Sequence, residues 1–209
     1  SSIQSQTCRQ RLLRVNPLLS RSSRAQTRIT YDIMDRPGPG NVLDRLTRHP
    51  FALAPLLQPA TYPPTARLIL HSDKFPNVIV VDANVSKMNT RNHGGGGMRG
   101  VGEALGPSTV SAVDGMQYVS ILDVLHAVHA GLSIPFSPTE WSALGGAKSW
   151  KAAKAYGRRM QAGGKGDWKR GVCHLDLLEG DTALVGIESL SVANAGSSVG
   201  LGRVFFGRP

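Results

Sequence analysis

The stretch ARLILHSDKFPNVIVVDA, residues 66–83, contains two short apolar runs separated by a turn-forming segment. Residues 66–72 and 77–83 are rich in aliphatic and β-branched side chains, which is typical of β-strands. The link between them, from Asp73 to Pro76, is too short for the crossover helix that parallel neighbours need. The pattern therefore predicts an antiparallel hairpin.

Four other segments predict the rest of the sheet. VCHLDLL (172–178) and ALVGIES (183–189) flank the turn-type sequence EGDT and predict a second hairpin. RITYDI (28–33) alternates apolar and polar residues and ends at a turn-rich break, and GRVFF (202–206) predicts a last strand. Because these links are short, the sheet is expected to be antiparallel.

VSILDVLHAVHAGL, residues 119–132, predicts the best-defined helix. Ser120, with Asp123 three residues on, is close to a capping box, and Gly131 stands near the expected end. The apolar residues follow the spacing of one helical face, which is expected to pack on the sheet. These residues are Ile121, Leu125, Val128 and Leu132.

Two more helices are predicted after this one. SPTEW (137–141) begins the first, with Ser137 as N-cap and Pro138 in the first turn. AKSWKAAKAYGRRMQ (147–161) predicts a basic helix. Together the elements predict an α+β fold, in which an antiparallel sheet packs against two or three helices.

The domain layout follows from length and composition. The 209 residues suit one domain with insertions better than two domains. We expect a flexible Arg-rich head over 1–14 and a single α+β domain over 15–209, with a glycine-rich insertion at about 87–115. The insertion contains HGGGGMRGVG (93–102), which we interpret as a spacer because successive glycines bury no apolar surface.

Two catalytic interpretations of this insertion lack their sequence context. HGGG together with GSSVG (196–200) is similar to an esterase oxyanion loop and nucleophile, but no Asp, Glu or His follows Ser198. Gly95, Gly97 and Gly100 match a dinucleotide fingerprint, yet the required strand does not directly precede them and no clear helix follows.

The charge of the chain indicates acidic partners. The formal net charge is +10, which favours contact with nucleic acid, an acidic membrane surface or an acidic protein.

The only two cysteines, Cys8 and Cys173, lie far apart, so no disulfide framework is indicated and an intracellular location, cytoplasmic or nuclear, is expected. The Arg-rich, acid-poor start is also typical of mitochondrial transit peptides. No run is apolar enough for a membrane span, so no integral membrane association is expected.

The basic helix and the residues after it are the best candidate binding surface. Cations at three-residue steps lie near aromatic residues, a combination that suits phosphates and exposed bases as well as acidic protein surfaces. The alternative is a solvated helix face whose aromatic residues pack inward. The candidates are Lys148, Lys151, Lys154, Arg158, Arg159, Lys165, Trp168, Lys169 and Arg170.

Three histidines form the only other candidate site. His126 and His129, at i and i+3, together with Cys173 and His174 are residue types that bind zinc. In a strand, however, Cys173 and His174 point to opposite faces, and imidazoles at the edge of a helix's apolar face are commonly buried and hydrogen-bonded. We therefore expect no metal and no cofactor, and keep His126, His129 and His174 as a candidate polar site.

The order of several short motifs resembles an uncharacterised fungal family, a domain of unknown function found in mushroom-forming basidiomycetes. The resemblance covers about Val15 to Ile187 and implies no activity, so no catalytic residue is carried over. This chain departs from the family pattern at Tyr31, where an indole is common, and in the segment 87–115. The motifs are VNPLLS (15–20), ITYDI (29–33), LLQPATYPPTARLIL (56–70), VSILDVLHAVHAGL (119–132), SPTEW (137–141) and GVCHLDLLEGDTALVGI (171–187).

The sequence therefore leads to three functional hypotheses. The first is a non-catalytic intracellular interaction module that binds an acidic protein surface. The second is a nucleic-acid-binding protein that uses the basic helix. The third is an uncharacterised enzyme built on the histidines.

Overall fold

The computed structural model describes residues 13–21, 27–83, 117–161, 171–192 and 199–209, and for 190–192 it describes the backbone alone. The insertion at about 87–115 and most of the predicted head lie outside these ranges. Leu13 is buried and Arg14 pairs with Tyr62, so both belong to the folded part of the chain. No helix in the described ranges combines the length and the apolar character needed to cross a bilayer.

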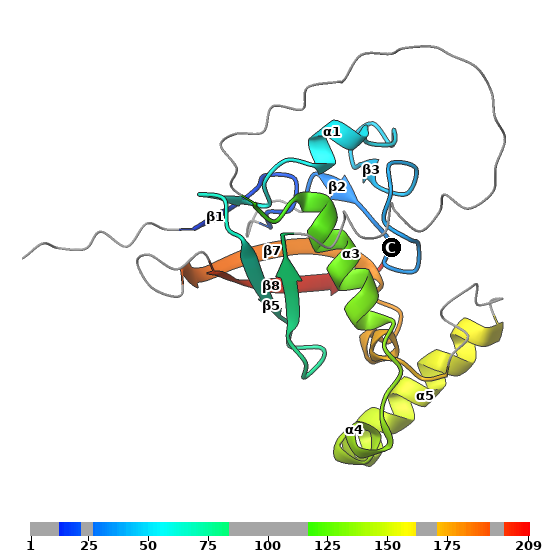
Figure 1. Ribbon diagram of the computed structural model, residues 1–209. Coiled ribbons are helices and arrows are strands. Elements are labelled where there is room, and N and C mark those ends of the chain that lie inside the picture. The colour runs from blue at the N-terminus through cyan, green and yellow to red at the C-terminus, as the bar shows by residue number, and fades with distance from the viewer. Residues whose placement is uncertain (1–12, 22–26, 84–116, 162–170, 193–198) are drawn as a thin grey trace, which may run out of the picture.

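The centre of the fold is a four-stranded sheet in the order β6-β5-β8-β7 (Figure 1). The hairpin of β5 (Arg67–His71) and β6 (Ile79–Asp82) is antiparallel, as the sequence predicts. β7 (Ala183–Val192) and β8 (Val199–Gly207) are also antiparallel. The α+β class is confirmed.

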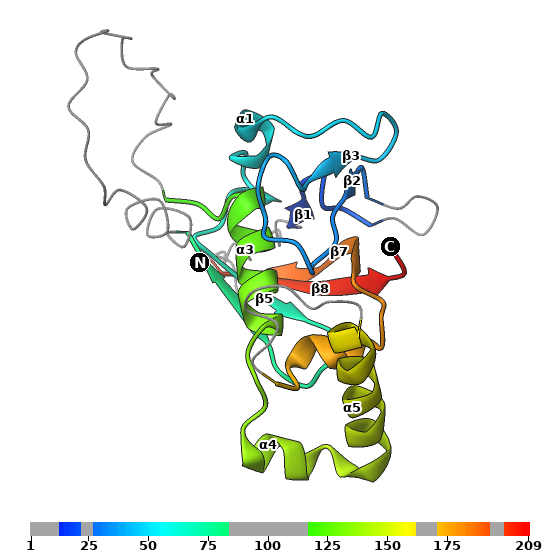
Figure 2. The ribbon, with the colours of Figure 1, turned by 90° about the vertical axis from the view of Figure 1, so that its right-hand side faces the viewer.

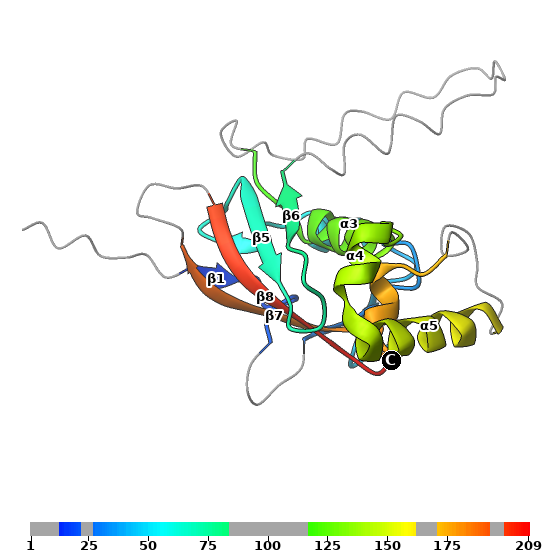
Figure 3. The same cartoon turned by 90° about the horizontal axis from the view of Figure 1, so that it is seen from below.

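One pairing in the sheet differs from the sequence-based expectation. β5 and β8 run parallel, with Leu68 opposite Gly200 and Leu70 opposite Gly202. The connection between them contains β6, the three largest helices and β7, so a parallel pair needs no short link here. Figure 3 shows β5, β8 and β7 side by side, with α3, α4 and α5 gathered beyond one side of the sheet.

Short elements before the sheet complete the N-terminal half. They pair as β1 with β4 and β2 with β3, both antiparallel. The bounds are β1 (Arg14–Val15), β2 (Ile29–Thr30), β3 (Leu43–Asp44), α1 (Leu53–Leu56) and β4 (Thr61–Tyr62).

The strand predicted at 28–33 forms only in part. Ile29–Thr30 pairs with β3, whereas the next residues run along β7, where the Leu184 N–H donates to the Tyr31 carbonyl at 2.9 Å. Ile29, Tyr31 and Ile33 are all buried, so the alternation of the sequence does describe which side chains enter the core. Burial raises the pKa of Tyr31, whose hydroxyl donates to the Asp35 carbonyl at 2.8 Å.

The strand predicted at 172–178 is wrong. His174–Leu178 forms a 3₁₀ helix, η3, and β7 pairs with β8 rather than with this segment. The turn begins because the Asp176 carboxylate accepts the Cys173 backbone N–H at 2.9 Å and closes the first turn. Cys173 and His174 are consequently both buried, and the expectation that they point to opposite faces of a strand does not hold.

The predicted helix at 119–132 is confirmed as α3 (Ile121–Leu132), which packs across one face of the sheet (Figure 1). Ser120 and Asp123 form a complete capping box, in which the Asp123 N–H donates to the Ser120 hydroxyl at 3.1 Å. The four residues of the predicted apolar face, Ile121, Leu125, Val128 and Leu132, are all at most 1% exposed. α3 therefore closes the main core.

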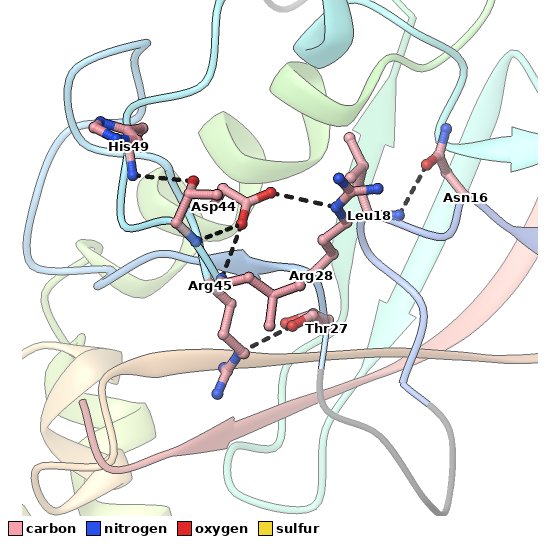
Figure 4. Close-up of polar contacts among 9 residues, drawn as sticks. Asn16, Leu18, Thr27, Arg28, Asp44, Arg45 and His49 are labelled. Atoms are coloured by element: carbon pink, nitrogen blue, oxygen red, sulfur yellow. Dashed lines mark hydrogen bonds and ion pairs between the residues drawn. The ribbon is translucent and has the colours of Figure 1, made fainter.

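Asp44 organises the loops of the N-terminal half. Its carboxylate accepts the backbone N–H groups of Leu46 at 2.8 Å and Thr47 at 3.0 Å, and it pairs with Arg28 at 3.3 Å (Figure 4). These contacts, led by the Thr47 N–H, lower the pKa of Asp44. Arg45 donates to the Thr27 carbonyl at 2.9 Å, which ties the same turn to the chain beside β7.

Gly186 allows the N-terminal segment to lie against β7. Its φ is 145°, and a Cβ at this position would lie 2.6 Å from Thr27 and 2.8 Å from Arg21. The strand has a register shift at the same place, between Leu184 and Gly186. A side chain there would require both an unfavourable backbone conformation and a displaced neighbour.

We expect Gly186→Ala to lower the free energy of unfolding by about 2–4 kcal/mol, because it adds backbone strain and a close contact. The matched control is Gly157→Ala in a helix, where a Cβ meets nothing within 4 Å. That change should raise stability by about 0.5–1 kcal/mol, since it lowers the entropy of the unfolded chain. Urea unfolding of both variants measures the difference, and equal effects would contradict this role of Gly186.

Candidate functional site

The two helices after α3 begin as the sequence predicts. α4 (Pro138–Ala143) has Ser137 as N-cap, and the Glu140 carboxylate accepts both the Ser137 hydroxyl at 2.7 Å and its N–H at 2.9 Å. α5 (Gly145–Gln161) follows α4 almost directly, and its first residue, Gly145, has a φ of 73°. The left-handed conformation suits glycine and lets the chain change direction between the two helices.

A buried ion pair holds α5 against the rest of the molecule. Arg159 donates to both carboxylate oxygens of Asp176, at 3.0 and 2.8 Å, and to the Gly171 carbonyl at 3.1 Å. The two side chains are only 6% and 2% exposed. Figure 2 shows α5 beside η3, the orange helix that carries Asp176. Ala152 and Ala155 are buried on the same side of α5, and their small side chains allow close approach.

Arg159 is therefore not part of the exposed binding face, and the sequence-based prediction for this residue is wrong. Its spacing from Ala152 and Ala155 turns it inward, where Asp176 pairs with it. Next to this pair, burial raises the pKa of Cys173 to about 12, so that the thiol is protonated at neutral pH.

Residues of α5 between Lys148 and Arg158 line a groove, which we call the basic groove. Its far wall is the turn from η3 to β7, with Glu179 and Asp181, and it encloses a cavity of about 1120 Å³. Glu179 has the left-handed φ of 54° that ends η3, an uncommon conformation for this residue type. The cationic side chains of the groove are Lys74, Lys148, Lys151, Lys154, Arg158 and Arg208.

Only some of these cations are paired across the groove. Lys151 pairs with Glu179 at 3.0 Å, and Lys74 pairs with Asp181. Within the described part of the chain, neither Lys148 nor Arg208 has an ion-pair partner, and both are exposed. The groove therefore has unneutralised positive charge at two places, on α5 and at the last residues of the chain.

Trp150 is the largest apolar side chain exposed in the basic groove. Its side chain is 63% exposed, and the Lys154 ammonium lies 5.1 Å from the ring centroid. The alternative expectation, that the aromatic residues of this helix pack inward, thus fails for Trp150. Such an exposed indole with a cation over it is suited to stacking or apolar contact with a ligand.

A second cavity of about 500 Å³ adjoins the groove, and we call it the apolar hollow. Four residues line both cavities, so the two are continuous: Asp73, Lys74, Lys148 and Leu177. Glu140 and Asn77 stand at its polar edge. Its apolar lining consists of Phe75, Pro76, Phe136, Ala143, Leu144 and Leu177.

His174 supports the wall of the apolar hollow. The imidazole is buried, lies edge-on to Phe136 with ring centroids 4.5 Å apart, and has Asn77 3.3 Å and Glu140 3.8 Å from Nε2. The hydrogen bonds from Ser137 and Asn77 lower the pKa of Glu140 to about 2. At neutral pH the Glu140 carboxylate is thus ionised, and it already accepts hydrogen bonds from within the protein.

The three candidate histidines lie on two elements: His126 and His129 are neighbours on α3 and interact electrostatically, whereas His174 lies on η3. His129 is buried and its Nδ1 lies 2.8 Å from the Ile33 carbonyl, as expected for a hydrogen-bonded core imidazole. His126 is half-buried, and burial lowers its pKa. His174 packs against Phe136, behind the lining of the apolar hollow. In the described ranges, no three His, Cys, Asp or Glu side chains are grouped so that they could hold a metal ion.

The other predicted binding residues divide into two sets. Lys148, Lys151, Lys154 and Arg158 lie along the basic groove. Lys165, Trp168, Lys169 and Arg170 lie outside the described residues. Sequence reasoning missed Lys74, Arg208, Glu179 and Asp181, because only the fold brings the β5–β6 turn, the last residues and the η3–β7 turn beside α5.

Comparison with known proteins gives one match. A model of a family of unknown function, DUF6699, matches residues 29–197. The matched range includes α5, η3 and the β5–β6 hairpin, and hence nearly all of the basic groove. No curated protein and no solved structure matches the chain significantly.

We expect Arg159→Met to lower the free energy of unfolding by about 3–5 kcal/mol, because it leaves the Asp176 carboxylate buried without its counter-charge. Combining it with Asp176→Leu should recover part of this loss. Arg158→Met, one residue earlier and exposed, is the control and should change stability by about 0.5 kcal/mol or less. Similar losses for the two arginines would show that the buried pair does not anchor α5.

The Glu140 carboxyl should titrate with a midpoint near pH 2, well below its ordinary value of 4.5. Since its folded pKa is lowered, its contribution to α4 is present above pH 4.5 and is lost as pH falls through about 2. The ¹³C chemical shift of the Glu140 carboxyl follows this directly. Ser137→Ala should move the midpoint upward more than Asn77→Ala does, and a midpoint near 4.5 in the unaltered protein would refute the capping geometry.

Proposed function

The chain belongs to DUF6699, a family of unknown function that assigns it no activity, and we propose that it is a non-catalytic interaction module whose basic groove binds an acidic segment of another protein. The observation that carries the proposal is the arrangement of charge around the basic groove. Lys148 and Arg208 are exposed without ion-pair partners in the described structure, while Lys151 and Lys74 are paired with carboxylates of the opposite wall. An acidic segment would supply the missing counter-charges.

The carboxylates of the groove favour a protein ligand over a nucleic acid. Glu179 and Asp181 stand among the cations, and a phosphate backbone carrying one charge per nucleotide would approach both of them. A protein segment carries carboxylates only at some positions, so it can place them beside Lys148 and Arg208 and leave neutral residues elsewhere.

Nucleic-acid binding is the second candidate because of Trp150. An exposed indole beside Lys154 is the kind of surface on which a single-stranded base stacks. An uncharacterised enzyme ranks third, since His129 and His174 are buried and hydrogen-bonded within the protein and none of the three candidate histidines lines the groove or the hollow.

The proposal includes an intracellular place of action in a fungal cell, in the cytoplasm or nucleus. The order of the sequence motifs supports the fungal origin, and the two distant cysteines support a reducing compartment. The mitochondrion is the alternative that the Arg-rich start suggests.

We expect the full chain, immobilised and presented with a displayed peptide library, to enrich Asp- and Glu-rich peptides. Lys148→Glu should weaken binding of an enriched peptide about tenfold, or by about 1.4 kcal/mol, because it replaces an unpaired cation by a repelling charge. Arg14→Glu is the control: it makes the same change of charge on β1, away from α5, and Arg14 is exposed. Fluorescence anisotropy of the labelled peptide gives both affinities.

The same measurement with a single-stranded RNA oligonucleotide distinguishes the second candidate. Binding of RNA that falls by about 10³-fold or more between roughly 50 and 200 mM salt, with no enrichment of acidic peptides, would replace the proposed function by nucleic-acid binding. Equal losses from Lys148→Glu and Arg14→Glu would show that net charge, not the groove, attracts the ligand.

A further inference from the structure

We propose that the acidic segment carries an aromatic side chain that inserts into the apolar hollow, so that the recognised chemistry is an aromatic residue flanked by carboxylates. This inference rests on the proposed function and specifies its ligand. It starts from a difference between the two linings: charged residues predominate in the basic groove, whereas half of the residues that line the hollow are apolar.

Some of the apolar surface that lines the hollow is exposed to solvent. Phe136, Leu144 and Leu177 are each half-buried, so part of each side chain faces solvent within the cavity. The volume of about 500 Å³ lies within the roughly 300–1,000 Å³ of ordinary ligand pockets. An inserted apolar side chain would remove this surface from water, which is a favourable change.

An aromatic side chain fits the lining better than an aliphatic one. Phe136 is already in edge and tilted contacts, with His174 at 4.5 Å and with Trp141 at 5.7 Å between ring centroids. Rings prefer such edge-to-face and tilted arrangements, and a further ring entering beside Phe136 would extend the cluster. Phe75, on the other wall, lies 5.9 Å from Phe206 in a tilted pair.

The charges at the edge of the hollow suit flanking carboxylates on the ligand. The two acids that line it are already engaged within the protein, Glu140 with Ser137 and Asp73 with Arg203. Lys148, which lines the hollow and the groove, has no ion-pair partner in the described structure. A carboxylate next to the inserted ring would therefore meet Lys148 as the nearest unneutralised charge at the junction.

The continuity of the two cavities makes one segment sufficient to fill both. Their linings share Asp73, Lys74, Lys148 and Leu177, so no wall of protein separates the hollow from the groove. A segment lying along α5 can place its carboxylates in the groove while one side chain turns into the hollow. Two weak sets of contacts then combine, because surface ion pairs alone contribute little.

The experiment compares two synthetic acidic peptides that differ only in a central Phe or Ser, using the full chain. The Phe peptide should bind about tenfold more tightly or better, since burial of its ring adds to the charge contacts. Ala143→Trp fills the hollow from the exposed helix α4 and should abolish this preference while leaving the Ser peptide unaffected. Ala153→Trp, also exposed on a helix but lining neither cavity, is the matched control and should retain the preference.

Nuclear Overhauser contacts from the peptide ring give a test that does not depend on a variant. They are expected to the methyl groups of Leu144 and Leu177, and contacts to Trp150 alone would overturn the inference. Equal affinities of the Phe and Ser peptides, both reduced by Lys148→Glu, would also overturn it while the proposed function stands. If neither peptide binds, the proposed function fails and the inference fails with it.

Discussion

The ion pair of Arg159 and Asp176 is the interaction on which the candidate site depends. Both groups are almost fully buried, and Asp176 also accepts the Cys173 N–H that begins η3. One carboxylate thus shapes η3 and holds the last turn of α5. Because Arg159, Ala152 and Ala155 face inward, the helical period turns Lys151 and Lys154 away from them, and these two lysines, together with Lys148 in the exposed first turn of α5, form one wall of the basic groove.

The local elements could be predicted from the sequence because short-range spacing determines them. The β5–β6 hairpin, the Ser120 cap of α3 and the Ser137–Pro138 start of α4 are confirmed in this way. The strand predicted at 172–178 is wrong because its apolar residues are buried in a 3₁₀ helix, and the partner that stabilises Asp176 comes from another element. The groove likewise combines residues from several elements. The sequence could therefore indicate its α5 cations, but not Lys74, Arg208 or the inward position of Arg159.

The groove combines paired and unpaired charges, and this combination distinguishes it from a simple basic surface. Where Lys151 and Lys74 meet Glu179 and Asp181, the ion pairs hold the two walls in position. Where Lys148 and Arg208 are exposed, a ligand can contribute the counter-charge. Exposed ion pairs are individually weak, so the proposed recognition relies also on shape and apolar contact at Trp150 and the apolar hollow.

The most direct test of this account is a map of amide chemical-shift changes in the ¹⁵N-labelled full chain when an acidic peptide is added. The account predicts that the largest changes fall on α5 from Lys148 to Arg158 and on the turn from Glu179 to Asp181. Largest changes on β5 and β8, where Ile69 and Leu201 face away from α3, would contradict it and would identify the sheet as the binding surface.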